Sequence, residues 1–119
     1  MIEFLTKPDL ATMDLGELSH KPTSISGDQM EASRELWQSK DGELSVGVWE
    51  CTAGRFSADR ANNSETCHLI SGSITLHGED GQTSNLKAGD LLTLPRGWRG
   101  EWTLHETTRK LYIIHNDED

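Results

Sequence analysis

Short runs of alternating apolar and polar residues, separated by turn-forming residues, occupy the chain from about residue 43 onward. In the first clear run, Leu44, Val46 and Val48 share one face of an extended segment. Later runs cover residues 65–70, 73–77, 83–86, 91–94, 99–105 and 109–115. The turns between them carry Gly, Asp and Asn. Strands of about five residues joined by such turns predict an all-β sandwich or barrel.

The first third of the chain lacks this regularity. Its apolar residues between positions 10 and 18 are too loosely spaced to predict a helix. Residues 34–39 are compatible with a strand. We therefore interpret residues 1–41 as an N-terminal arm that packs on the barrel or on a neighbouring subunit, or alternatively as a mobile lead. Residues 42–115 would form the barrel, and residues 116–119 an acidic tail.

Two spacing motifs within the predicted barrel resemble those of the cupin family. Glu65 and Gly72 match Glu-x6-Gly, the end of the family's first motif. The second motif, Gly-x5-Pro-x-Gly-x2-His, is matched at Gly89, Pro95 and Gly97, with Gly100 in place of the His. The chain is most similar to the branch of small cupins related to ureidoglycine aminohydrolase and ethanolamine-utilisation cupins. This resemblance implies a single jelly-roll β-barrel and, as in other small cupins, a homodimer.

Composition narrows the class of partner. With 119 residues the chain is one domain, and its net charge of −9 argues against nucleic acid or an anionic membrane as a partner. Only 34% of the residues are hydrophobic, so the core must depend on large side chains such as the four tryptophans. Two cysteines do not make a disulfide scaffold, and no signal-peptide core is seen, so we expect a cytoplasmic protein.

The resemblance also implies a metal, which most cupin enzymes hold with three His and one Glu. In this sequence residues 58–64, where two of these His are expected, contain none, and the third position is Gly100. Only Glu65 remains. We therefore expect no metal cofactor, because tight sites need several converging ligands. The alternative is a divalent transition metal held by substitute ligands. All five histidines are interpreted as ordinary surface residues.

Glu65 needs another explanation, because an isolated carboxylate inside a barrel is costly. Lys110, or Arg109 beside it, could supply the opposite charge, and Tyr112 shares a face with Lys110. Trp102 would form a wall of the resulting pocket. Such a pocket could bind a small polar metabolite, or perform acid–base chemistry with a raised Glu pKa or a lowered Lys pKa. Alternatively the charges form a purely structural ion pair.

Cys67 is predicted to point inward beside Glu65, and we include it among the pocket residues. Lys110 could activate it as a nucleophile, although a buried and inert cysteine is the commoner outcome. Three functions therefore stay open. The first is metal-independent binding of a small polar metabolite, and the second is a metalloenzyme acting on a C–N bond. The third is a non-catalytic interaction module, which a barrel without a cavity would favour.

Overall fold

A computed structural model describes residues 2–116 of the chain. The strands are β1 (Ser19–His20), β2 (Met30–Gln38), β3 (Leu44–Cys51), β4 (Gly54–Asp59), β5 (Ser64–Ser71), β6 (Ser73–Gly78), β7 (Thr83–Lys87), β8 (Leu91–Leu94), β9 (Arg99–Leu104) and β10 (Thr108–His115). Within the described residues no helix has the length and apolar character needed to cross a membrane. The regular elements of the described residues are strands, as the alternating pattern predicts.

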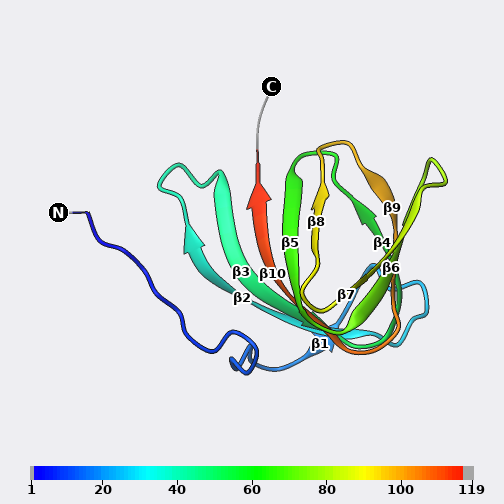
Figure 1. Ribbon diagram of the computed structural model, residues 1–119, viewed down its shortest axis with the longest axis horizontal. Coiled ribbons are helices and arrows are strands. Elements are labelled where there is room, and N and C mark those ends of the chain that lie inside the picture. Colours follow the sequence, from blue (N-terminus) through cyan, green and yellow to red (C-terminus); the bar gives the residue numbers. More distant parts are fainter. Residues whose placement is uncertain (1, 117–119) are drawn as a thin grey trace.

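The strands form two antiparallel sheets that face each other (Figure 1). The six-stranded sheet has the order β1-β2-β3-β10-β5-β8, and the four-stranded sheet has the order β4-β9-β6-β7. Consecutive strands β3 and β4, and likewise β5 and β6, lie in different sheets. This repeated crossing closes the two sheets into a jelly-roll barrel, so the predicted fold class is confirmed.

Alternation along β5 decides which side chains enter the barrel. Glu65, Cys67 and Leu69 are buried, whereas His68 between them is exposed. On β10, Lys110 pairs with Leu69 and Tyr112 pairs with Cys67. Successive strand residues point to opposite faces, so this register brings the inward residues of the two strands together. The inward direction predicted for Glu65 and Cys67 is confirmed.

The glycines of the two motifs lie at turns that other residues would strain. Gly72, between β5 and β6, has φ 99°, and a Cβ there would also meet the backbone of Thr108 at 2.7 Å. Gly97 has φ 95°, inside a turn in which the Trp98 amide donates to the Pro95 carbonyl. Glycine adopts this left-handed conformation without steric cost. The motif spacing therefore reflects turns that the barrel requires.

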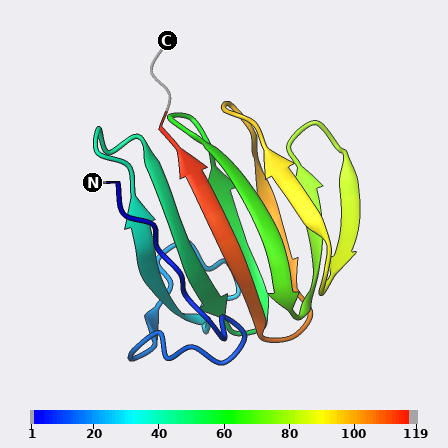
Figure 2. The same ribbon diagram turned by 60° about the vertical axis from the view of Figure 1, so that its left-hand side comes forward.

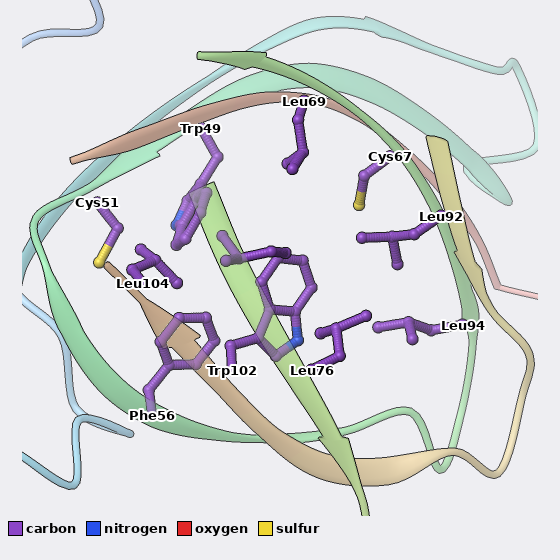
Figure 3. Packing of buried hydrophobic residues seen from close by; sticks show 11 residues of the cluster. Trp49, Cys51, Phe56, Cys67, Leu69, Leu76, Leu92, Leu94, Trp102 and Leu104 are labelled. Atoms are coloured by element: carbon purple, nitrogen blue, oxygen red, sulfur yellow. The ribbon is translucent and has the colours of Figure 1, made fainter. Parts of the chain in front are cut away.

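An aromatic cluster lies inside the barrel among buried aliphatic side chains (Figure 3). Phe56 stacks on Trp102 with ring centroids 5.6 Å apart, and Trp49 meets both rings edge-on. Trp49 and Trp102 thus supply core bulk as expected. The other two tryptophans lie nearer the surface. Trp98 is half-buried against the core, and only Trp37 is exposed.

The N-terminal segment is partly inside the sheet and partly outside it. Strand β2 is hydrogen-bonded to β3, so residues 30–38 extend the six-stranded sheet. Before β1 the chain passes along the outside of the six-stranded sheet (Figure 2). There Arg109 donates to the carbonyls of Leu10 at 2.7 Å and Met13 at 2.9 Å. Of the predicted tail, residues 117–119 lie outside the described residues.

Candidate binding pocket

A cavity of about 680 Å³ opens between the inner face of the six-stranded sheet and β4. Its floor is the aromatic cluster of Trp49, Phe56 and Trp102. Hydroxyl-bearing and charged side chains form its walls, among them Thr23, Ser33, Glu35, Ser45, Ser57, Asp59, Arg60 and Tyr112. Because these polar groups converge above an apolar floor, the cavity has the general character of a small-molecule site.

A buried ion pair joins two strands at the wall of this cavity. Lys110 Nζ lies 3.0 Å from Glu65 Oε2, and the two side chains are only 8% and 6% exposed. The same ammonium lies 4.3 Å from the ring centroid of Trp102 and 4.4 Å from that of Trp49. It is therefore stabilised by a carboxylate and by two aromatic faces. Of the two cations considered as partners of Glu65, Lys110 is the one that pairs with it, whereas Arg109 pairs with Glu50.

Burial and charge act in opposite directions on this pair. Burial alone would raise the pKa of Glu65, but the nearby charges of Lys110 and Arg60 and a hydrogen bond from Lys110 lower it overall. Burial would lower the pKa of Lys110, but the Glu65 carboxylate raises it overall. Both groups are thus held in their charged forms. The acid–base alternative would need the reverse shifts, so these pKa directions do not support it.

Arg60 is a second cation beside Glu65 that the sequence analysis did not identify. Its Nη1 lies 3.7 Å from Glu65 Oε1. The backbone of Arg60 is fixed from both sides, because its amide donates to the Trp98 carbonyl and its carbonyl accepts from the Gly97 amide. Its Nε is buried and has no hydrogen-bond partner among the described residues. No motif marked this residue, because its position depends on the loop between β4 and β5.

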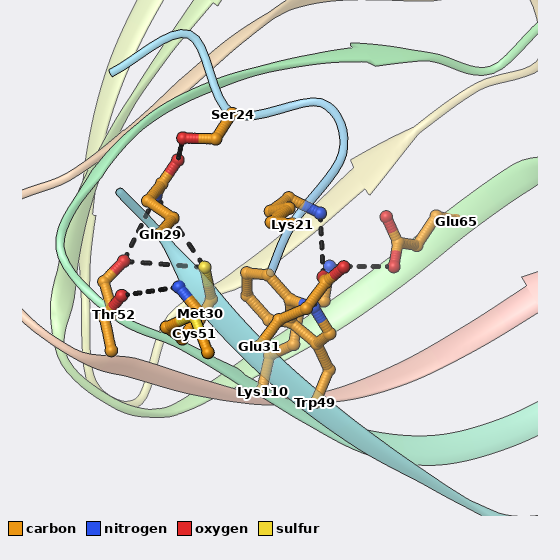
Figure 4. A network of polar contacts seen from close by, with 10 residues as sticks. All are labelled: Lys21, Ser24, Gln29, Met30, Glu31, Trp49, Cys51, Thr52, Glu65 and Lys110. Carbon is orange, nitrogen blue, oxygen red and sulfur yellow. Dashed lines mark hydrogen bonds and ion pairs between the residues drawn. The ribbon is translucent and has the colours of Figure 1, made fainter. Parts of the chain in front are cut away.

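A second lysine–carboxylate pair lies near the first, and both lysines approach the Trp49 ring (Figure 4). Lys21 Nζ lies 2.9 Å from Glu31 Oε1 and 4.3 Å from the Phe56 ring centroid. The Trp49 indole also donates to Glu31 at 2.9 Å. Burial tends to raise the pKa of Glu31, but the hydrogen bonds from Trp49 and Lys21 lower it overall. Sequence reasoning missed this pair because Lys21 belongs to a segment without periodicity.

The family model described as "EutQ-like cupin domain" matches residues 38–112, well over half of the chain. The chain belongs to this cupin family. The resemblance inferred from the two motifs is thereby confirmed. Among curated proteins, none matches the chain.

Several solved cupin structures share the fold. The EutQ protein of Clostridium difficile is 18% identical, with a TM-score of 0.72 over 92% of this chain and 78% of that one. An ethanolamine utilization protein, EutQ, of Salmonella typhimurium LT2 is 20% identical, with a TM-score of 0.67 over 85% and 80%. An ectoine synthase of P. lautus is 19% identical, with a TM-score of 0.67 over 81% and 67%. At these identities the similarity shows the fold alone.

The side chains of this cavity do not fit the metal that the family resemblance implies. Within residues 2–116 no group of three or more His, Cys, Asp and Glu side chains is arranged to hold a metal ion. Glu65, the ligand retained from the motif, faces two cations, Lys110 at 3.0 Å and Arg60 at 3.7 Å. These cations already neutralise the carboxylate and would repel a divalent ion at the same oxygens.

The other predicted pocket residues occupy different depths of this cupin barrel. Trp102 lies in the floor, and Tyr112 lies in the wall, packed over Gly47. Burial, and then the charge of Glu35, raises the pKa of Tyr112. Cys67 is not among the residues that line the cavity, because it points deeper into the core. Burial raises the pKa of its thiol to about 12, which opposes the nucleophilic role considered for it.

Proposed function

We propose that this cupin domain binds a small polar metabolite in the barrel cavity, without the usual cupin metal. The observation that carries the proposal is the cavity itself, with the Glu65–Lys110 pair in its wall. Its volume of about 680 Å³ lies within the range of roughly 300–1,000 Å³ typical of small-molecule sites. A purely structural role of the Glu65–Lys110 pair would not require an open cavity beside it.

The alternatives have less support. An interaction module was expected to have a filled barrel, whereas this barrel keeps a cavity. A metalloenzyme acting on a C–N bond would need a ligand set that the described residues do not provide. We retain the cytoplasm as the proposed location, since both cysteines are free, as a reducing compartment favours.

A cavity-filling variant tests the proposal. Ser45 lies on β3, lines the cavity and is half-buried, so Ser45→Phe places a ring in the binding space. Ser71→Phe adds the same ring at an exposed position outside the cavity and serves as the matched control. A thermal-shift screen of polar metabolites should find a compound that stabilises wild type and Ser71→Phe but not Ser45→Phe. A compound that stabilises all three equally would place its binding elsewhere and contradict the proposal.

The metal-free part of the proposal needs its own measurement. Wild type and Glu65→Ala are purified without chelator or affinity tag and analysed for transition metals. We expect a substoichiometric metal content in both proteins. Near-stoichiometric Mn, Fe, Ni or Zn in wild type that disappears in Glu65→Ala would refute this part and restore the metalloenzyme.

A further inference from the structure

Most of the charged side chains around the cavity form ion pairs within the protein. Six charged side chains line it, namely Lys21, Glu35, Asp59, Arg60, Glu65 and Lys110. Lys110 is paired with Glu65, Lys21 with Glu31, and Asp59 with Arg99 at 3.4 Å. Arg60 makes only a long contact with Glu65, at 3.7 Å. Glu35, of opposite charge, has no ion pair among the described residues.

Arg60 keeps most of its hydrogen-bonding capacity. A guanidinium has five N–H donors, and the contact with Glu65 at 3.7 Å is too long to count as a hydrogen bond. The buried Nε has no partner among the described residues. A buried donor left unsatisfied is costly, and a guanidinium matches an oxyanion of planar geometry better than any other side chain does. Its backbone hydrogen bonds hold Arg60 at the cavity wall, where the guanidinium can bind a carboxylate.

Glu35 is an exposed carboxylate on another wall of the cavity. It lies on β2, and no ion pair or side-chain hydrogen bond of Glu35 occurs within the described part of the chain. It is close enough to Tyr112 for its charge to act on the phenol. The hydroxyls of Ser33 and Ser45 line the same side of the cavity, on β2 and β3. A carboxylate and two hydroxyls suit a ligand group that donates hydrogen bonds.

The strand order of the sheet separates Glu35 from the Glu65 side of the cavity, where Arg60 lies. Strand β2 of Glu35 and strand β5 of Glu65, which Arg60 approaches, are separated by β3 and β10. With neighbouring strands about 4.8 Å apart, the two backbones lie roughly 14 Å apart along the sheet. Side chains that reach inward from both strands shorten this gap. A ligand whose acid and donor groups are several carbon atoms apart can follow the remaining separation across the aromatic floor.

We propose that the ligand of this cavity is a small carboxylic acid with an amino or hydroxyl group at its other end. Arg60 would bind the carboxylate, and Glu35 would accept hydrogen bonds from the distal donor. Glu65 would act as a positioning residue that holds Arg60 at the wall. The aromatic floor would contact the aliphatic segment between the two ends. This inference rests on the proposed binding function of the cavity.

The probe we choose is δ-aminovalerate, compared with its amide, with valerate and with glycine. Binding is followed by the ¹H–¹⁵N signal of Arg60 Nε, a site-specific reporter of the guanidinium. We expect δ-aminovalerate to bind more tightly than the other three compounds and to shift this signal. Arg60→Gln should weaken its binding roughly ten- to a hundredfold, as the loss of a charged hydrogen bond does, with little effect on the amide.

Matched variants separate this inference from the proposed function. Arg55→Gln removes an arginine that is paired with Glu101 and does not line the cavity, so it should leave binding unchanged. Glu35→Gln should remove the preference for δ-aminovalerate over valerate.

Equal binding of acid and amide, no effect of Arg60→Gln, or no binding of any of these probes would overturn the inference. The cavity function would then still stand if the wider screen found a ligand that Ser45→Phe excludes. If that screen also failed, both proposals would fall.

Discussion

Replacing Lys110 with methionine should be among the most damaging single changes in this barrel. Methionine keeps most of the length and volume of the side chain but removes the ammonium. The change leaves the Glu65 carboxylate in a site where its side chain is only 6% exposed. It also removes the cation that lies 4.3 Å from the Trp102 centroid and 4.4 Å from that of Trp49.

The size of the effect follows from the burial of the pair. Breaking a buried ion pair by removing one partner costs about 3–5 kcal/mol, because the remaining charge is uncompensated. Because both side chains are less than a tenth exposed, solvent screening reduces this figure little. Arg60, with Nη1 at 3.7 Å, gives partial compensation and favours the lower half of the range. A domain of this size has a total stability of roughly 5–15 kcal/mol, so Lys110→Met would be close to unfolding.

Urea denaturation at neutral pH, followed by tryptophan fluorescence, measures this loss. A double-mutant cycle makes the measurement specific to the pair. Glu65→Leu combined with Lys110→Met replaces both charges by apolar groups, and such replacements are often nearly neutral. We expect the double variant to be more stable than Lys110→Met, with a coupling energy of about 3 kcal/mol.

Two results would refute this reasoning. A loss of less than about 1 kcal/mol in Lys110→Met would mean that the pair behaves like a surface salt bridge. Additive effects in the cycle would mean that the two side chains stabilise the fold independently. Arg99→Met, which breaks the exposed pair with Asp59, is the control and should change the stability little.

Three further predictions follow from the same structure. Because the pKa of Glu65 is lowered from 4.5, the stability that its charge contributes should be present above that pH and lost as the pH falls through the folded-state pKa. The raised pKa of Lys110 places the corresponding alkaline loss above pH 10.5. Urea midpoints of wild type and Glu65→Gln, compared across acid pH, measure the acid effect. Cys51 and Cys67, with pKa values of about 11 and about 12, should react with a thiol reagent at pH 8 only after unfolding, and fast reaction of the folded protein would contradict their burial. Gly47→Ala should cost about 1–3 kcal/mol in urea, since its Cβ would overlap the Tyr112 ring and lie 2.6 Å from the Arg34 backbone carbonyl. An unchanged midpoint would contradict this overlap.

Much of the fold could be predicted from the sequence because period-two patterns and turn glycines are local signals. The runs from residue 65 to residue 115 correspond closely to strands β5–β10, with boundaries within a residue or two. The same alternation placed Glu65 inside the barrel but left Lys110 and Arg109 as alternative partners, and the structure selects Lys110. Strand β2 was only partly foreseen, because its membership of the sheet depends on hydrogen bonds to β3 rather than on its own pattern.

The character of the pocket was decided by the tertiary structure. Arg60 and Lys21 lie in loops, and only the path of those loops brings them to the cavity. The sign of each pKa shift also depends on the fold. Burial alone would raise the pKa of Glu65 and lower that of Lys110, and the 3.0 Å approach of the two groups reverses both shifts. A sequence specifies which residues face inward, but the balance between desolvation and charge depends on distances that only the assembled barrel sets.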